Sequence, residues 1–222
     1  MKEYHKIQTV FKRDPQTKFK TLLEGEFSLP CFDFLKDNRW VFTEKVDGTN
    51  IRVMLQDGLT FGGKTDRAQI PATLVERLYQ RFTEEGLRAQ FPDGVCLYGE
   101  GYGARIQKGG GNYRQDQDFV LFDVKVGDWW LERSSVEDVA TALGIDVVPV
   151  IGVGTLADMV ERCRTGIKSQ WGDFAAEGIV ARPAVELKTR SGDRIITKLK
   201  TRDFTSNKQL NTKNNADKEG KQ

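Results

Sequence analysis

Histidine is almost absent from this chain of 222 residues, since His5 is the single example. One histidine excludes catalytic triads and metal centres that need several imidazoles. The three cysteines (Cys31, Cys96 and Cys163) are odd in number and lack metal-ligand spacing, so we interpret them as reduced packing thiols. No apolar run approaches the roughly 18 residues that span a bilayer, and the N-terminus lacks a signal-peptide core. We therefore expect an intracellular, cytoplasmic protein without membrane contact.

A large excess of charge of one sign is also missing, because the net charge is only +2. Basic residues nevertheless gather at Lys6–Lys20, at Arg105–Arg114 and from Lys188 onward. Such clusters can contact a phosphate backbone, and a solvated charged surface explains each cluster equally well.

The size and composition suit one substantial globular domain, with 38% hydrophobic and 30% charged residues. We predict a domain over residues 1–202. We expect the polar, lysine-rich residues 203–222 to form a mobile tail.

Strand patterns outnumber helix patterns. Residues 50–56 alternate, with Ile51, Val53 and Leu55 on one face. The predicted strands are 40–45, 50–56, 59–62, 95–100, 119–126, 147–151, 178–182 and 194–200. The predicted helices are 71–82, one that begins with a Ser134–Glu137 capping box and ends at Gly144, and 155–163. We expect an α+β fold of antiparallel sheets flanked by helices.

The most informative motif is Glu44-Lys45-Val46-Asp47-Gly48-Thr49-Asn50, in which a lysine is followed two residues later by Asp-Gly. A neutral lysine amine can attack the α-phosphate of ATP and form a phosphoramidate. Because a free lysine has a pKa of about 10.4, burial and nearby positive charge must lower it. An ordinary surface turn would also explain the motif if it stood alone.

Two carboxylates stand at the ends of predicted strands. Glu100 ends one strand and Glu177 begins another. A carboxylate at such an edge can hold a ribose hydroxyl or a hydrated Mg²⁺, and each can equally be a solvated strand end.

Lys198 and Lys200 lie two apart on a predicted strand, so both side chains point to one face. Paired ammonium groups can neutralise the charge that develops at an α-phosphate. An exposed strand face is the alternative.

Aromatic and glycine-rich segments complete the set. Phe119 and Phe122 face opposite sides of a strand, so one can stack on a base while the other fills the core. The glycine-rich loop Gly101–Tyr113 would allow the backbone to approach a ligand closely, although it lacks the spacing of a P-loop. The alternative, which composition alone favours, is a mobile surface loop.

Taken in order, the motifs around Lys45, Glu100, Phe122, Glu177 and Lys198 resemble the covalent nucleotidyltransferases, which include nucleic-acid ligases and RNA-capping enzymes. Gly48-Thr49-Asn50 and Ile106-Gln107-Lys108 resemble RNA ligases of the RNA ligase 2 type. The resemblance spans roughly 6–200. It implies a ligase-type adenylation domain that joins RNA 3′-hydroxyl and 5′-phosphate ends through lysyl-AMP and an RNA-adenylate.

The resemblance also implies site residues. The implied catalytic residues are Lys45, Glu177, Lys198 and Lys200. The implied ATP-binding residues are Glu44, Asp47, Gly48, Asn50, Lys64, Glu100, Gln107 and Phe122. The implied metal ligands are Glu177 and Glu100, with Mg²⁺ or Mn²⁺ bound. Gln107 would help to read adenine, and Phe122 would stack on it.

The chain departs from the family pattern at Lys64, where the family usually has arginine, so a bidentate grip on phosphate is replaced by a point charge. Only 22 residues follow Lys200, whereas the family commonly adds a C-terminal domain. Expected partners are ATP and RNA, as a nicked duplex or broken strand ends, and phage-encoded RNA repair would suit so compact an enzyme. The alternatives are a DNA ligase, a capping guanylyltransferase that uses GTP, and a non-catalytic nucleotide-binding protein.

Overall fold

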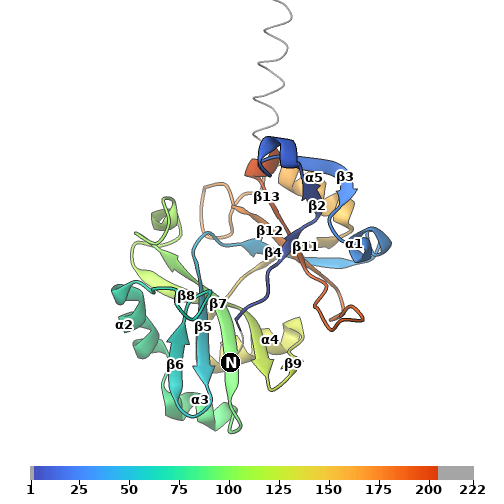
Figure 1. Cartoon of the computed structure of the whole chain (residues 1–222). Helices are drawn as coiled ribbons and strands as arrows, with labels where there is room; N and C mark the ends of the chain where they lie inside the picture. Colours follow the sequence, from blue (N-terminus) through green and yellow to red (C-terminus); the bar gives the residue numbers. More distant parts are fainter. Residues whose placement is uncertain (1–2, 205–222) are drawn as a thin grey trace, which may run out of the picture. The chain divides into compact units, whose positions relative to one another are not determined.

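The computed structural model describes residues 3–204, which fall into two compact units (Figure 1). The first unit comprises Met1–Lys6 and Val46–Pro149. Among the described residues, the second comprises Ile7–Lys45 and residues 150–204. The chain passes from one unit to the other after Lys6, Lys45 and Pro149. Lys45 is therefore the last residue of its segment in the second unit.

The first unit is built on a mixed sheet in the order β10-β8-β7-β5-β6, with β9 paired to β8 (Figure 1). Only the β10–β8 pair is parallel. The strands are β5 (Thr49–Leu55), β6 (Leu59–Gly62), β7 (Val95–Gly103), β8 (Gln117–Val126), β9 (Trp129–Trp130) and β10 (Asp146–Val147). The helices are α2 (Ala72–Arg81), α3 (Glu84–Gln90), η2 (Gly110–Asn112) and α4 (Arg133–Leu143).

Strand alternation decides which face of this sheet is buried. Ile51, Val53 and Leu55 are fully buried in one hydrophobic cluster with Leu74 and Leu78 of α2. The intervening residues of β5 point to the opposite face. The sequence prediction for β5 is thus confirmed, and the polar face is the one that carries the predicted nucleotide-binding side chains.

The second unit contains a five-stranded sheet in the order β1-β13-β12-β4-β11 and a two-stranded ribbon, β2-β3. The β1–β13 pair is parallel and the other pairs are antiparallel. The strands are β1 (Gln8–Thr9), β2 (Phe11–Arg13), β3 (Leu22–Phe27), β4 (Trp40–Lys45), β11 (Val150–Gly154), β12 (Gly178–Pro183) and β13 (Thr197–Lys200). The helices are η1 (Pro15–Thr17), α1 (Pro30–Phe34) and α5 (Leu156–Thr165).

One hydrophobic cluster holds the second unit together. Trp40 and Phe42 of β4 are fully buried with Ile179 of β12, and Met159 and Cys163 of α5 pack in the same cluster. The indole Nε1 of Trp40 donates to the carbonyl of Leu35 at 2.8 Å, so its polar atom is satisfied inside the core. Trp40 and Phe42 therefore face this core, and the alternating residues Val41, Thr43 and Lys45 lie on the other face of β4.

Three predicted boundaries are wrong. The predicted capping box of Ser134 and Glu137 does not form, because the N-cap of α4 is Glu132 and the Glu137 carboxylate binds Arg133 instead. The predicted strand 147–151 is two strands, one in each unit, that are separated at Val148-Pro149. The strand predicted from Arg194 begins only at Thr197.

Other local predictions are confirmed. Thr155 caps α5 through a capping box with Asp158, and Gly144 ends α4 in a left-handed conformation. The fold class is α+β with mainly antiparallel sheets, as expected. Within residues 3–204, no helix is both long and apolar enough to cross a bilayer.

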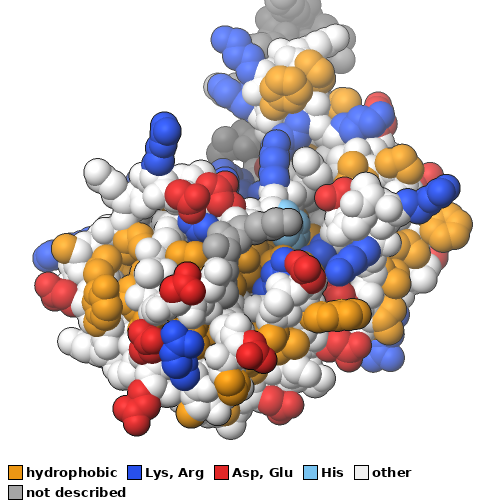
Figure 2. Space-filling model, turned by 60° about the horizontal axis from the view of Figure 1, so that its bottom comes forward, with side chains coloured by type: hydrophobic (Ala, Val, Ile, Leu, Met, Phe, Trp, Pro, Cys, Tyr) orange, Lys and Arg blue, Asp and Glu red, His pale blue; other side chains and the backbone are white. Residues whose placement is uncertain are grey.

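The surface and the C-terminal boundary bear on the remaining predictions. On the face shown in Figure 2, lysine and arginine side chains are interspersed with aspartate and glutamate side chains. Asp203 and Phe204, the first residues of the predicted tail, are buried in the second unit. Residues 205–222 lie outside the described part of the chain, so the predicted tail stays a prediction.

Candidate active site

Three neighbouring strands of the second unit bring Lys45 and Lys200 into one row. Gly178 of β12 is the register partner of Lys45 on β4 and of Lys200 on β13. The two lysines therefore flank a single glycine. Because paired residues in adjacent strands project to the same face of a sheet, both lysine side chains lie on the face opposite the core.

Glu177, the residue before Gly178, joins the two lysines. Its Oε2 lies 2.5 Å from Lys45 Nζ, and its Oε1 lies 2.6 Å from Lys200 Nζ. The three side chains are only 12–22% exposed. Burial alone would raise the pKa of Glu177, but attraction to Lys45 and hydrogen bonds from Lys200 and Lys45 outweigh it and hold the pKa below its usual value. The carboxylate is thus kept ionised between two ammonium groups.

Gly178 is required by the close approach of β13. A Cβ at this position would lie 2.0 Å from the carbonyl oxygen of Leu199 and 2.8 Å from the Cα of Lys200. Both contacts are to backbone, which cannot rotate away. The glycine therefore sets the spacing on which the row of lysines depends.

Lys198 occupies the next row on the same face. It is the register partner of Val180, which in turn pairs with Thr43. Lys198 and Lys200 are both partly buried, while Leu199 between them is fully buried in the core. The prediction that both lysines share one face is confirmed by this alternation.

Glu44 lies on the other face of β4. Its side chain is 1% exposed, and its carboxylate oxygens accept from Ser169 Oγ at 2.7 Å and from the backbone N–H of Gln170 at 2.8 Å. Burial raises the pKa of Glu44, and the two hydrogen bonds only partly oppose this. The predicted role of Glu44 in ATP binding stays a prediction, and the contacts that it makes are to protein.

The first unit carries the other predicted residues, and Asn50 and Glu100 are direct cross-strand partners on its polar face. Asn50 Oδ1 is buried, and no residue of the described chain donates to it. Gly48 approaches β7 so closely that a Cβ would lie 2.2 Å from the carbonyl oxygen of Gly101 and 2.8 Å from Glu100 Cγ. Only glycine fits at this position, which explains the Asp-Gly pair in physical terms.

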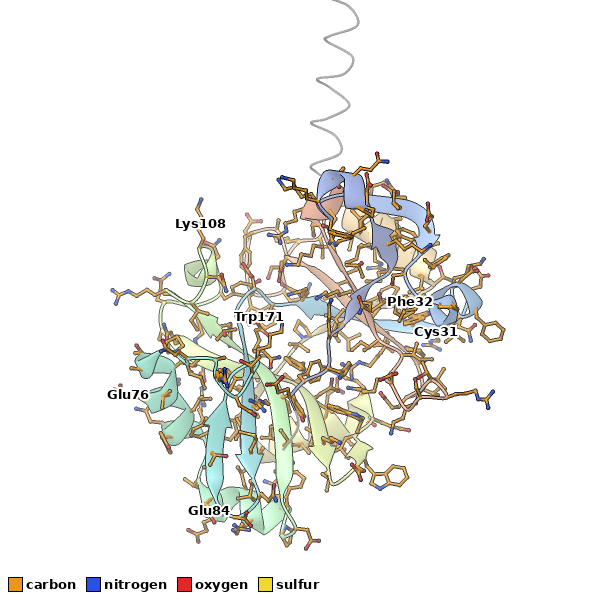
Figure 3. All side chains as sticks on the ribbon, in the orientation of Figure 1. Cys31, Phe32, Glu76, Glu84, Lys108 and Trp171 are labelled. Atoms are coloured by element: carbon orange, nitrogen blue, oxygen red, sulfur yellow. The ribbon has the colours of Figure 1, made fainter. Side chains whose placement is uncertain are left out.

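The glycine-rich loop is folded back on the start of β5. Gln107 Nε2 donates to the carbonyl oxygen of Gly48 at 3.0 Å, and Tyr113 Oη accepts from the backbone N–H of Asp47 at 3.2 Å. Gly110 is buried against the carbonyl of Gly103. Lys108, at the loop surface, points away from the ribbon (Figure 3). The loop is therefore tied by hydrogen bonds to the motif that follows Lys45.

Phe122 sits at a β-bulge. Tyr98 pairs with Asp123 and Gly99 with Leu121, so Phe122 is the extra residue on β8. Its ring meets the ring of Tyr4 at 5.1 Å, edge to face, and Tyr4 Oη donates to Asp123 Oδ2 at 2.5 Å. Phe119 is instead packed in the core against Phe82. The prediction that Phe119 and Phe122 face different surroundings is confirmed, although a bulge rather than simple alternation aims Phe122.

Lys64 is exposed after β6, and a buried arginine holds its loop. Arg52 Nε donates to the carbonyl of Gly63 at 2.9 Å, and Arg52 Nη2 lies 2.7 Å from Asp66 Oδ1. Glu3 accepts from the backbone N–H of Asp66. Lys64 is thus presented on a loop that is anchored on both sides.

The sequence did not predict four residues that hold the candidate site residues in position. These are Tyr4, Arg52, Tyr113 and Ser169. Tyr4 and Ser169 bind partners more than a hundred residues away in the sequence. Tyr113, at the end of the glycine-rich loop, binds Asp47, and Arg52 binds the loop that follows β6. For Arg52, the signal in the sequence is a charged residue between Ile51 and Val53 in the alternating stretch 50–56.

The carboxylates available for a divalent cation are few. No group of three or more His, Cys, Asp or Glu side chains that could hold a metal ion occurs among residues 3–204. Glu177 is partly buried and ionised, which suits a cation that is bound mainly by substrate phosphates and water, with one or two carboxylates. The donor set fits a metal that arrives with a nucleotide rather than a cation held by protein ligands alone.

The model of the RNA ligase family matches residues 38–200. The chain belongs to the RNA ligase family. The match covers both groups of predicted site residues, from Glu44 and Lys45 through Lys200. It supports the recognition made from the ordered motifs, whereas the RNA ligase 2 subtype stays a prediction.

Solved structures agree on the fold. Naegleria gruberi RNA ligase with pyrophosphate is 18% identical, with a TM-score of 0.65 over 92% of this chain and 59% of that one. A variant of the same ligase with ATP and Mn is 17% identical, with a TM-score of 0.65 over 92% and 58%. An apo variant is 18% identical, with a TM-score of 0.65 over 93% and 60%. A search of curated proteins gave no match.

This member of the family spans about 60% of the length of those Naegleria ligase chains. At such identities the likeness concerns the fold.

Proposed function

We propose that this protein is an ATP-dependent RNA ligase that joins RNA 3′-hydroxyl and 5′-phosphate ends, with Lys45 as the nucleophile. The observation that carries the proposal is the Lys45–Glu177–Lys200 cluster in a chain of the RNA ligase family. A lysine at the end of a strand, beside a second ammonium group and a shared carboxylate, provides both a nucleophile and a cationic site for phosphate.

In the first step, Lys45 Nζ attacks the α-phosphorus of ATP. A phosphorus–nitrogen bond forms, the bond to the bridging oxygen breaks and pyrophosphate leaves with the electron pair. The ammonium group of Lys45 must lose its proton before its lone pair can attack. A triphosphate competes with Glu177 for Lys200, and Lys200 together with Lys198 stabilises the negative charge that grows on the phosphoryl oxygens.

In the second and third steps, the adenylyl group passes to the RNA and is then displaced. An RNA 5′-phosphate oxygen attacks the lysyl-AMP phosphorus and releases Lys45. The 3′-hydroxyl of the other end attacks the activated 5′-phosphate, forms the phosphodiester bond and releases AMP. The protons that the Lys45 ammonium group and the 3′-hydroxyl lose pass to solvent, and the reaction needs neither an oxidant nor a further co-substrate.

Adenosine recognition is assigned to the first unit. The buried, unsatisfied Oδ1 of Asn50 and the neighbouring Glu100 carboxylate provide acceptors for hydroxyl or amino groups. Gln107 supplies an amide that suits adenine, and Phe122 supplies an aromatic face. Asp47 and Gly48 shape the adjoining turn, and Lys64 offers a charge to phosphate.

Glu177 in the second unit and Glu100 in the first are each a candidate ligand for a divalent cation, Mg²⁺ or Mn²⁺. When bound, the cation would neutralise phosphate charge. The protein groups described above act independently of that contribution, because they bind the phosphates, orient Lys45 and select the base.

The test is to incubate the protein with a divalent cation and either α-labelled ATP or α-labelled GTP and then to run denaturing electrophoresis. We expect acid-labile label from ATP alone, which is lost in Lys45→Ala. Exposed Lys168→Ala is the matched control, because its side chain is 70% exposed and pairs only with Asp173 among the described residues. Label from GTP would assign the capping reaction instead.

The polynucleotide is then identified with nicked duplexes whose broken strand is RNA or DNA and with single RNA strands. We expect sealing of RNA ends. Sealing of DNA alone would reassign the protein to the DNA ligases, and labelling without any sealing would leave only the nucleotidyl transfer.

A further inference from the structure

Two consecutive residues of β4, Glu44 and Lys45, bind the two ends of the segment Ser169–Glu177. Glu44 binds Ser169 and Gln170 on the core face of the strand, whereas Lys45 binds Glu177 on the opposite face. The segment Ser169–Glu177 therefore begins on the core face of β4 and ends on its opposite face. Trp171, labelled in Figure 3, lies within it.

The segment is closed by its own hydrogen bonds. The backbone N–H of Ser169 donates to the carbonyl of Phe174 at 2.9 Å, and the N–H of Ala176 donates to that of Ile167 at 2.8 Å. Ser169 Oγ, which donates to Glu44, also accepts from the N–H of Trp171 at 3.1 Å. These bonds make the segment a short compact loop.

Contacts outside the loop hold both of its ends. Thr201 holds its end, with its N–H donating to the carbonyl of Glu177 and its Oγ1 to that of Ala176. At the other end, the two bonds to Glu44 satisfy a carboxylate that is 1% exposed. A buried carboxylate that accepts two hydrogen bonds is strongly directional, because losing either donor leaves a desolvated oxygen.

We infer that Glu44 is a positioning residue for nucleotidyl transfer: it fixes the Ser169–Glu177 segment so that Glu177 meets Lys45 and Lys200. The inference rests on the proposed function, since it assigns to Glu44 a part in that reaction. It differs from the expected role in ATP binding, because the Glu44 carboxylate faces the core side of β4 and is occupied by the loop.

The chemistry of the site explains why a remote anchor matters. The Glu177 oxygens lie 2.5 and 2.6 Å from the two ammonium groups, so a shift of the loop end changes both pairs together. Displacement of reacting groups by about 1 Å can cost roughly a hundredfold in rate. The cost falls on the chemical step rather than on binding of the nucleotide.

The test compares Glu44→Gln, Ser169→Ala and the double variant, with Glu26→Gln as control. An amide can still accept from Ser169, but where its NH₂ faces the N–H of Gln170 the acceptor is lost. We expect each single variant to lower the rate of lysyl-AMP formation roughly tenfold or more, with the KM for ATP within about twofold of wild type. The double variant should be no worse than the more impaired single variant, because both remove one anchor.

Glu26 is a suitable control because it is an exposed carboxylate of the same unit that pairs with Lys12. A raised KM for ATP in Glu44→Gln, together with an unaffected Ser169→Ala, would overturn the inference and restore a direct contact with the nucleotide. Multiplicative losses in the double variant would also overturn it.

Hydrogen exchange separates this inference from the proposed function, since it needs no activity. We expect the amides of Gln170 and Trp171 to exchange faster in Glu44→Gln than in wild type, while the amides of β4 stay protected. Unchanged exchange in the segment would refute the anchor whether or not the protein forms lysyl-AMP.

Discussion

Replacing Gly178 with alanine tests the row of lysines directly. The added methyl carbon would lie 2.0 Å from the carbonyl oxygen of Leu199 and 2.8 Å from the Cα of Lys200. Since both neighbours are backbone atoms, β12 and β13 must separate by roughly 1 Å or more to restore an ordinary contact. Lys200 would move away from Glu177 while Lys45, on the other neighbouring strand, stays in place.

We expect Gly178→Ala to lower both the stability of the fold and the rate of lysyl-AMP formation. Overpacking of a well-packed interior typically costs about 1–3 kcal/mol, so we expect the free energy of unfolding to fall by about 2 kcal/mol. For a chain of this size that loss corresponds to a melting temperature lower by roughly 4–8 °C. The misplacement of Lys200 by about 1 Å should in addition lower the rate of lysyl-AMP formation by roughly a hundredfold.

The assay combines urea unfolding with single-turnover transfer of labelled AMP, at a temperature where both proteins are folded. Gly58→Ala is the control, because an added Cβ there meets nothing closer than Glu84 Oε2 at 3.6 Å. Wild-type stability together with a wild-type rate of AMP transfer in Gly178→Ala would show that β13 does not need a glycine at position 178. Lost stability with unchanged transfer would refute the link between strand spacing and chemistry.

Three further predictions follow from the same contacts. Because the folded-state pKa of Glu177 lies below its ordinary value of 4.5, its ion pairs stabilise the fold fully above about pH 4.5 and are lost as the pH falls through the lower folded-state pKa. The difference in unfolding free energy between wild type and Glu177→Gln should therefore shrink over that range, and a difference that does not change with pH would contradict this. Asp118→Asn should lower the free energy of unfolding, measured with urea, by about 3 kcal/mol, because three arginines contact this buried carboxylate. A decrease well below about 1 kcal/mol would contradict this prediction. Burial raises the pKa of Cys163 to about 12. This thiol and the buried Cys96 should therefore react with a thiol reagent only after unfolding, whereas Cys31 should react first. Rapid labelling of Cys163 in the native protein would contradict the burial of Cys163 in the hydrophobic cluster of the second unit.

Local pattern was enough for the strands that matter most. The strand Trp40–Lys45 and the strand Leu59–Gly62 have the predicted bounds, because apolar alternation and a two-residue turn are encoded within a few residues. The shared face of Lys198 and Lys200 followed from the same alternation. The family was recognised from ordered motifs, and its model matches residues 38–200.

Long-range contacts were beyond the sequence. Nothing near Glu44 indicates that Ser169 and Gln170 will occupy its carboxylate, since those partners lie more than a hundred residues away. The bulge that aims Phe122 arises from the register between β7 and β8, and one extra residue on a strand leaves no local mark. The Ser134 capping box failed because Glu137 found a stronger partner in Arg133, one turn earlier in the helix.

The division of the chain into two units was also not encoded in any linker. The crossings after Lys6 and Lys45 lie between ordinary residues, and the third follows the single proline Pro149, so none is marked by a run of glycine, proline or serine. The pattern at 147–151 therefore predicted one strand where Pro149 ends the first unit. Proline at that position removes a backbone donor, which interrupts the pairing.

The most direct test of the central claim is to locate the adenylyl group on the protein. The protein is incubated with ATP and a divalent cation and digested, and the modified peptide is sequenced by mass spectrometry under conditions that preserve the phosphoramidate. We expect AMP on Lys45, none on Lys198 or Lys200, and loss of the adduct in Glu177→Ala. AMP on a different lysine, or a Lys45 adduct that forms equally well without Glu177, would contradict it.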